Sequence, residues 1–335
     1  MLKKILLIIA CCCLSSKHTD AQVITDSLAN DFRTFVSVNF SRFRTVNAFW
    51  ETQLNHDYIF TLDGKDVEKG RKKNLHTFKF STMIPIVKSK RLSLYANMQY
   101  DRYQFDTENK LNHAPSAVFA QNHYDYFAGG LNGSYYMSLF RKPFVISASV
   151  TADAWNKGWG MLMGTASGVM VFKNTAWTTF SAGIMLMTHF SSIPIMPILT
   201  YWHRFKNPNL SADITFPSQF YLRYQMKKQR ISLGAFMSSD NFYLKTNLEG
   251  APRISYYCDA VLKPEIHYEY IINKHIYLSA HAGLSMVMTG GLYKKNRKGI
   301  RVNNEDGNSE VEPVVKQDRS PIPFFNVGIS YSLFK

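Results

Sequence analysis

Hydrophobic and polar residues alternate with a period of two in many segments of the chain. In the stretch FFNVGISYSLFK, apolar and aromatic side chains from Phe325 to Leu333 fall on one face, and small polar side chains from Asn326 to Ser332 fall on the other. Successive side chains of a β-strand point to opposite faces, so this alternation predicts a strand with one apolar face. Comparable segments recur at residues 32–43, 91–100, 143–155, 178–190, 218–228, 264–272 and 275–288.

The length of these segments favours a membrane barrel over a soluble sandwich. They run about 9–15 residues, whereas soluble strands usually run about 5–6 and a tilted strand needs about 9–11 to cross the hydrocarbon. The chain after residue 21 has no apolar run of about 18 residues, so no membrane-spanning helix is predicted. The sequence therefore predicts an all-β fold, a closed antiparallel transmembrane β-barrel of about 12–14 strands.

The segments between the predicted strands alternate in length, as in outer-membrane barrels. Short links include RKP at Arg141 and NK at Asn273. Long loops are expected at residues 62–74, 106–122, 158–168, 238–252 and 293–321.

Three prolines limit the strand count, because proline cannot donate a backbone hydrogen bond to a sheet. The strand that contains Pro194 and Pro197 should begin at the rim of the barrel. The stretch from Ala212 to Tyr224 contains Pro217 and forms either one strand or two. This choice moves the count between 12 and 14.

The first residues, MLKKILLIIACCCLSSKHTDAQ, combine a basic start, an apolar run from Ile5 to Leu14 and a polar stretch before Ala21. This pattern predicts a secretory signal peptide over residues 1–21, followed by a short periplasmic lead at 22–30 and the barrel at 31–335. The alternative is a lipoprotein signal in which one of the cysteines 11–13 is lipidated. Without the leader, Cys258 is the only cysteine, so no intrachain disulfide is expected.

The end of the chain resembles the C-terminal assembly signal of Gram-negative outer-membrane barrels, with Tyr331 and Phe334 as its aromatic residues. The stretch IPIMPILTYWHRF at 193–205 and the one that follows at 216–244 resemble a group of outer-membrane barrels of unknown function. The resemblance implies a location in the cell outer membrane and assembly by the barrel assembly machinery. It implies no chemistry.

The chain carries 39 lysine and arginine residues against 24 aspartate and glutamate, a formal net charge of +15. Export argues against a nucleic-acid partner. The expected partners are outer-membrane lipid, including the phosphates of lipopolysaccharide, and small solutes. No cofactor is expected, and the ten histidines show no sequence motif for a metal.

One weak enzymatic candidate occurs at THFSSIP, where His189 and Ser191 share a strand face. The spacing resembles the start of the His-x-Ser-Asn arrangement of barrel lipases and lipid A deacylases. Ser192 stands where that arrangement has Asn, and the apolar face from Phe180 to Leu186 places His189 on the lumenal side. The expectation is therefore that the protein is not an enzyme, with a barrel-embedded lipid hydrolase as the weaker alternative.

Polar residues opposite the apolar stripes should project into the lumen. These candidates for lining the lumen are Arg223, Gln225, His267, Glu269 and His281. They predict a passive or facilitated channel or transporter for small polar solutes, with anions favoured if the basic surplus lines an open path. Long inward side chains or the Gly158–Gly168 loop could plug it. The alternative is a structural or surface-binding barrel that acts through its long loops.

Overall fold

The computed structural model describes residues 44–333 apart from 90, 110–118, 120, 157, 189–194, 247–248, 296–299 and 304–308. The predicted signal peptide, the periplasmic lead and Phe334 lie outside these residues. Among the described residues, no helix is long and apolar enough to cross a bilayer.

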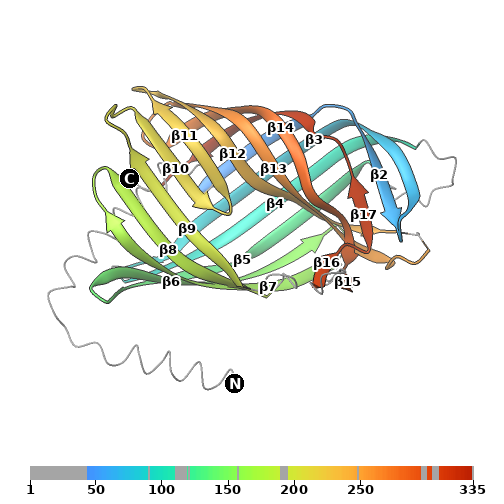
Figure 1. The fold of residues 1–335 in the computed structure, drawn as a ribbon, viewed down its shortest axis with the longest axis horizontal. Helices are drawn as coiled ribbons and strands as arrows, with labels where there is room; N and C mark the ends of the chain where they lie inside the picture. The colour runs from blue at the N-terminus through green and yellow to red at the C-terminus, as the bar shows by residue number, and fades with distance from the viewer. Residues whose placement is uncertain are drawn as a thin grey trace, which may run out of the picture.

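The strands form one closed antiparallel barrel of fourteen strands (Figure 1), at the upper end of the predicted range. Around the wall the order is β1, β18, β14, β13, β12, β11, β10, β9, β8, β7, β6, β5, β4, β3 and back to β1. The strands are β1 (Val46–Gln53), β2 (His56–Leu62), β3 (Lys65–Lys88), β4 (Leu92–Asn109), β5 (His123–Leu139), β6 (Lys142–Trp155), β7 (Gly158–Asn174), β8 (Thr178–Met187), β9 (Ile195–Arg204), β10 (Leu210–Phe216), β11 (Gln219–Gln225), β12 (Gln229–Lys245), β13 (Ile254–Ile271), β14 (Ile276–Lys294), β15 (Ile300–Asn303), β16 (Ser309–Glu312), β17 (Val315–Asp318) and β18 (Ile322–Tyr331).

The seam of the barrel joins its first and last wall strands. β1 pairs with β18 from Val46 opposite Tyr331 to Gln53 opposite Phe324. On its other side β1 pairs with β3. At the outer end, β2 and β17 continue the same seam, because β17 pairs with both β2 and β14. No backbone edge is therefore left open at the seam, as a strand in hydrocarbon requires.

An apolar belt surrounds the wall, as the alternation predicts. Each of the fourteen wall strands exposes at least one large apolar side chain, for example Val327 and Ile329 on β18. Near the short turns, exposed tyrosines such as Tyr224, Tyr270 and Tyr331 mark the interface with the headgroups. Such a barrel with a lipid-facing belt is the architecture of bacterial outer-membrane proteins, and the protein resides in that membrane.

Several strands continue beyond the belt. On β3 the outward side chains are apolar at Ile84 and Ile86 but exposed and charged at Lys69 and Arg71. On β4 the outward face changes from Met98 to the exposed Arg102. Charged outward residues lie in water, so this end of the barrel extends past the membrane.

All five expected loops are wholly or partly strand, and β4 includes residues 106–109 of the loop expected at 106–122. Residues 62–74 form most of the β2–β3 hairpin, β7 includes all of 158–168, β12 continues through 238–245, and β15, β16 and β17 occupy parts of 293–321. The reason is that the alternation persists past the membrane while its outward face becomes polar. The Gly158–Gly168 region is wall and does not plug the lumen.

The prolines behave as expected where they are described. Pro217 lies in the turn between β10 and β11, so residues 212–224 form two strands. Pro197 lies near the start of β9. The pairing of β9 with β10 begins only at Leu199, so Pro197 lies outside that pairing. Pro194 lies outside the described residues.

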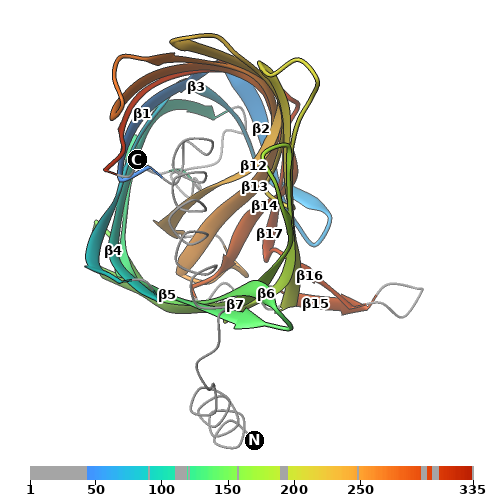
Figure 2. The same ribbon diagram turned by 90° about the vertical axis from the view of Figure 1, so that its left-hand side faces the viewer.

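On one side of the barrel the wall strands are short, and the longer strands next to them turn inward. β8 to β11 are short, and β11 pairs with β12 only as far as Phe236. Above this point β12 leaves the wall: Tyr243 donates a hydrogen bond to Asp153 on β6 at 2.8 Å, and Asn241 N–H donates to Tyr103 Oη on β4 at 3.3 Å. Figure 2, viewed along the barrel, shows β12, β13, β14 and β17 crossing the interior.

Candidate functional site in the barrel interior

A cavity of about 520 Å³ lies inside the barrel at the level of the apolar belt. It opens among inward side chains of β1, β3, β4, β11, β12, β13, β14 and β18. Its charged and histidine lining consists of Glu51, Lys79, Asp101, Arg223, Lys263, Glu265, His267 and His281. The aromatic lining consists of Phe49, Phe80, Tyr221, Phe236 and Phe324.

Two ion pairs join strands that are not neighbours in the wall. Lys79 on β3 contacts Asp240 on β12 at 2.7 Å, and Lys263 on β13 contacts Glu51 on β1 at 2.5 Å. The Lys263 side chain is 1% exposed and that of Glu51 is 7% exposed. Buried charges of this kind are retained only when they are paired, because desolvation of an isolated ion is very unfavourable. The pairs therefore hold the two sides of the interior together.

A second group of ion pairs lies toward the short-turn end. Glu269 accepts hydrogen bonds from Arg230 at 3.0 Å and contacts Arg44 at 2.6 Å. Arg223 contacts Asp213 at 2.7 Å. Glu269 and Asp213 offset two of the three guanidinium charges, so this group of five residues keeps one positive charge.

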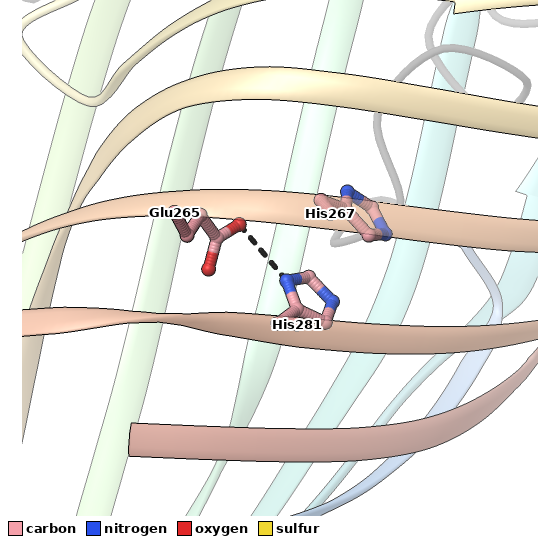
Figure 3. Close-up of side chains that lie close together, drawn as sticks. All are labelled: Glu265, His267 and His281. Carbon is pink, nitrogen blue, oxygen red and sulfur yellow. Dashed lines mark hydrogen bonds and ion pairs between the residues drawn. The ribbon is translucent and has the colours of Figure 1, made fainter. Parts of the chain in front are cut away.

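Between these two groups, Glu265, His267 and His281 lie close together (Figure 3). Glu265 and His267 are on β13, and His281 stands directly opposite His267 on β14. Glu265 Oε1 lies 2.9 Å from His281 Nδ1 and accepts a hydrogen bond from Tyr221 Oη at 2.7 Å. The two imidazole rings stack with centroids 3.8 Å apart.

The five predicted lumen residues all belong to the inward face of their strands. Arg223, His267 and His281 line the cavity. Gln225 accepts a hydrogen bond from Arg230 Nε, and Glu269 is held by two arginines as described above. Contact of any of the five with a solute stays a prediction.

Tyr331 is the last residue of β18, where it faces Val46 of β1 and Ile276 of β14. Its role in assembly stays a prediction. His189 and Ser191 lie outside the described residues, as does Phe334, so the lipid-hydrolase hypothesis is unchanged.

Sequence reasoning missed Glu51, Lys79, Asp240 and Lys263. The alternation of the sequence could have indicated them, since each is a charged residue on the strand face opposite the apolar stripe. It also missed the cluster of Glu265 with the two histidines. The two histidines lie on consecutive strands, and the register in which β13 pairs with β14 places them directly opposite each other.

The outer end of the interior is closed by an aromatic core, here called the outer seal. It consists of Tyr58, Phe60, Leu75, Tyr103, Phe105, Phe119, Tyr124, Phe242, Leu244, Tyr257, Leu292, Val314 and Val315. Phe242 and Tyr257 stack with ring centroids 4.4 Å apart, and Phe60 and Leu292 are fully buried. The inward turn of β12 and β13 carries Phe242, Leu244 and Tyr257 across the lumen.

One lysine is buried within the outer seal. Lys72 Nζ lies 4.0 Å from the ring centroid of Phe119, and three further rings lie within 5.6 Å. Burial, and after it the positive charge of Arg319, lowers the pKa of Lys72 to about 7. Lys72 lies at the level of the charged outward residue Arg71, outside the membrane.

No protein-family model matches the chain. No curated protein matches it either.

Solved structures give matches at low identity. The transport unit of the autotransporter AIDA-I from Escherichia coli is 10% identical, covers 92% of this chain and 99% of its own, and has a TM-score of 0.36. An outer-membrane channel from Pseudomonas putida F1 is 8% identical over 86% of this chain and 95% of its own, with a TM-score of 0.39. A FadL homologue from Pseudomonas aeruginosa is 11% identical over 86% and 90%, with a TM-score of 0.37. All three are similar to this chain as barrels.

The wall, the belt and the filled interior together define the class of the protein. It is an outer-membrane β-barrel of fourteen strands, as the alternation of the sequence predicted.

Proposed function

We propose that the protein is a gated channel or facilitated transporter for small polar solutes. The observation that carries the proposal is the cavity of about 520 Å³ inside the barrel, lined by charged groups and aromatic rings. Its volume is within the range of about 300–1,000 Å³ that binds small molecules. Polar groups between apolar rings are the lining that orients a small polar solute.

The lining supports neutral or zwitterionic solutes better than anions. The described residues around the cavity include as many cations as carboxylates: Lys79, Arg223 and Lys263 against Glu51, Asp101 and Glu265. The basic surplus of the chain therefore lies elsewhere than in this lining. A solute with both charges would meet partners for each.

Passage requires movement of the outer seal, because the aromatic core fills that end of the interior. Asp153 holds the inward-turned part of β12 in place. Its carboxylate accepts hydrogen bonds from Tyr243 at 2.8 Å and from Tyr126 at 3.1 Å. Asp153 is 1% exposed. We infer that Asp153 is a latch for the closed state.

Conductance in planar bilayers and uptake by proteoliposomes test the proposal. We expect low conductance from the wild type and a higher open probability from Asp153→Ala, because β12 loses its attachment to β6. Glu108→Ala, which changes an exposed carboxylate, is the matched control and should behave as the wild type. If correctly folded wild type and Asp153→Ala both conduct nothing and take up no amino acid or sugar, the transport function is wrong.

A second candidate function is binding at the outer surface. β15 and β16 form a hairpin of their own, separate from the barrel sheet, and Figure 2 shows it projecting from the wall. Such a projection is suited to contact with a partner. Shortening the segment between β14 and β17 should abolish binding of cells or matrix if this function holds, while conductance would be unchanged.

A further inference from the structure

We propose that Glu265, His267 and His281 form a binding site for one divalent transition-metal ion of the Zn²⁺ class. The three residues offer ligand atoms that all lie within 4.8 Å of one another. Two imidazoles and a carboxylate are a common protein ligand set for such an ion. The proposal concerns metal binding alone and does not depend on transport through the barrel.

The β-sheet positions the three side chains on one surface. His267 and His281 are directly paired across β13 and β14, and Glu265 precedes His267 by two residues on the same strand. Residues two apart on a strand share a face, and directly paired residues have neighbouring Cβ atoms. The site is therefore built on the rigid wall, which holds ligands more accurately than a loop does.

The site contains buried polar atoms that the protein leaves without a hydrogen bond. These atoms are Glu265 Oε2, His267 Nε2 and His281 Nε2. The side chains are 0%, 7% and 12% exposed, respectively. Buried polar atoms without a partner are unfavourable and rare, and a bound ion is one way to supply partners to ligand atoms of this cluster.

The surroundings orient the carboxylate of Glu265. Tyr221 Oη donates a hydrogen bond to Glu265 Oε1 at 2.7 Å, which fixes one oxygen and leaves Oε2 for an ion. Outer contacts of this kind orient metal ligands. The two histidine rings are stacked at 3.8 Å and 12°, so their nitrogens lie close to one another on the same face of the sheet.

The ligand set and the nearby charges define the class of ion. Ca²⁺ and Mg²⁺ prefer oxygen ligands, so nitrogen from two histidines selects against them. The guanidiniums of Arg223 and Arg44 each contact a carboxylate, at 2.7 and 2.6 Å. Three protein ligands leave a fourth position of a tetrahedral ion for water or a solute in the cavity.

The test uses the full-length barrel, folded in detergent, without a histidine tag and stripped with a chelator. Isothermal titration with Zn²⁺ and elemental analysis after dialysis should give one ion per barrel. Titration with Co²⁺ should produce the visible absorption of a low-coordinate site. We expect His267→Ala or His281→Ala to weaken binding by about 100-fold or more, and Glu265→Gln by about tenfold.

Controls separate the site from accidental binding and from misfolding. His203→Ala removes a histidine on β9 that bonds Thr178 outside the cluster, and it should bind as the wild type does. Heat-modifiable migration on a gel verifies that each variant is folded, and His267→Gln and His281→Gln replace any alanine variant that is not. The proposal is overturned if the wild type binds no ion, or if folded variants of the cluster bind it as tightly as the wild type. Because the assay needs no conductance, its outcome is distinct from that of the transport experiment.

Discussion

The barrel interior is filled in two different ways along its length. At the level of the membrane belt it contains paired charges around a cavity. The outer seal is an aromatic core around Lys72, and its Tyr58 and Tyr257 donate hydrogen bonds to the buried carboxylates of Glu68 and Asp259. Charged pairs need particular geometries and further hydrogen bonds to offset their desolvation. Aromatic rings pack closely without such strict geometric requirements, so little space is left between them. The comparison shows that the same wall can hold a polar cavity at one level and an aromatic core that closes the lumen at another.

The largest loss in the free energy of unfolding should follow from a variant that leaves one buried charge without its partner. Glu51→Ala leaves the ammonium of Lys263 buried, and we expect a loss of about 3–5 kcal/mol in the free energy of unfolding. Urea unfolding in lipid vesicles measures it. The double variant Glu51→Ala with Lys263→Met should recover most of the loss. A Glu51→Ala barrel as stable as the wild type would show that water solvates this region.

Truncation of a core side chain in the outer seal should lower the free energy of unfolding somewhat less than Glu51→Ala does. Leu292 is fully buried, and Leu292→Ala should lower the unfolding free energy by about 3 kcal/mol through lost burial and a new cavity. Leu54→Ala, at a side chain that is 60% exposed, is the matched control and should have a much smaller effect. Equal losses for the two variants would contradict the dry packing of the seal.

The buried lysine of the outer seal should make stability depend on pH. The folded pKa of Lys72 is lowered to about 7 from an ordinary value of 10.5, so between these pH values the unfolded chain binds more protons and stability rises with pH. Below pH 7 both states are protonated and the unfavourable buried charge is fully present. Lys72→Met should therefore stabilise the barrel at pH 6 by about 1–3 kcal/mol.

The measurement is urea unfolding of wild type and Lys72→Met at several pH values from 6 to about 10, the range set by the two pKa values. The advantage of the variant should shrink as the pH rises. A constant difference over this range would mean that the four surrounding rings keep Lys72 charged.

The smallest effect is expected for an exposed ion pair between the neighbouring strands β3 and β4. Lys73 contacts Glu108 with side chains that are 34% and 57% exposed. Lys73→Ala should change the unfolding free energy by less than about 1 kcal/mol, because water already solvates both groups. A loss comparable to that of Glu51→Ala would remove the distinction between buried and surface pairs.

The lipid-facing half of the fold could be predicted from the sequence, because lipid imposes a strict rule on one face of each strand. Phe220, Leu222 and Tyr224 are exposed as their alternation predicted. Above the membrane the rule is lost, since Lys69 and Arg71 face water and look like a loop in sequence. The strand extensions were therefore assigned to loops.

The interior could be predicted only in part. The inward direction of Arg223 and His267 follows from alternation, but their partners depend on which strands are neighbours and in what register. Lys79 and Asp240 are 161 residues apart, and they meet only because β12 turns across the lumen. No local pattern in the sequence carries that information.

The seam between β1 and β18 also has a consequence for the order of events during folding. Arg44, just before β1, donates a hydrogen bond to Ser330 of β18, a residue 286 positions later. Contacts between such distant residues have a high contact order, and the loop-closure entropy must be lost before they stabilise anything. Closure of the ring is thus expected as a late step, and until then β1 and β18 present open edges that invite pairing with other chains. A partner that covers those edges in the meantime would protect the unfinished barrel from aggregation.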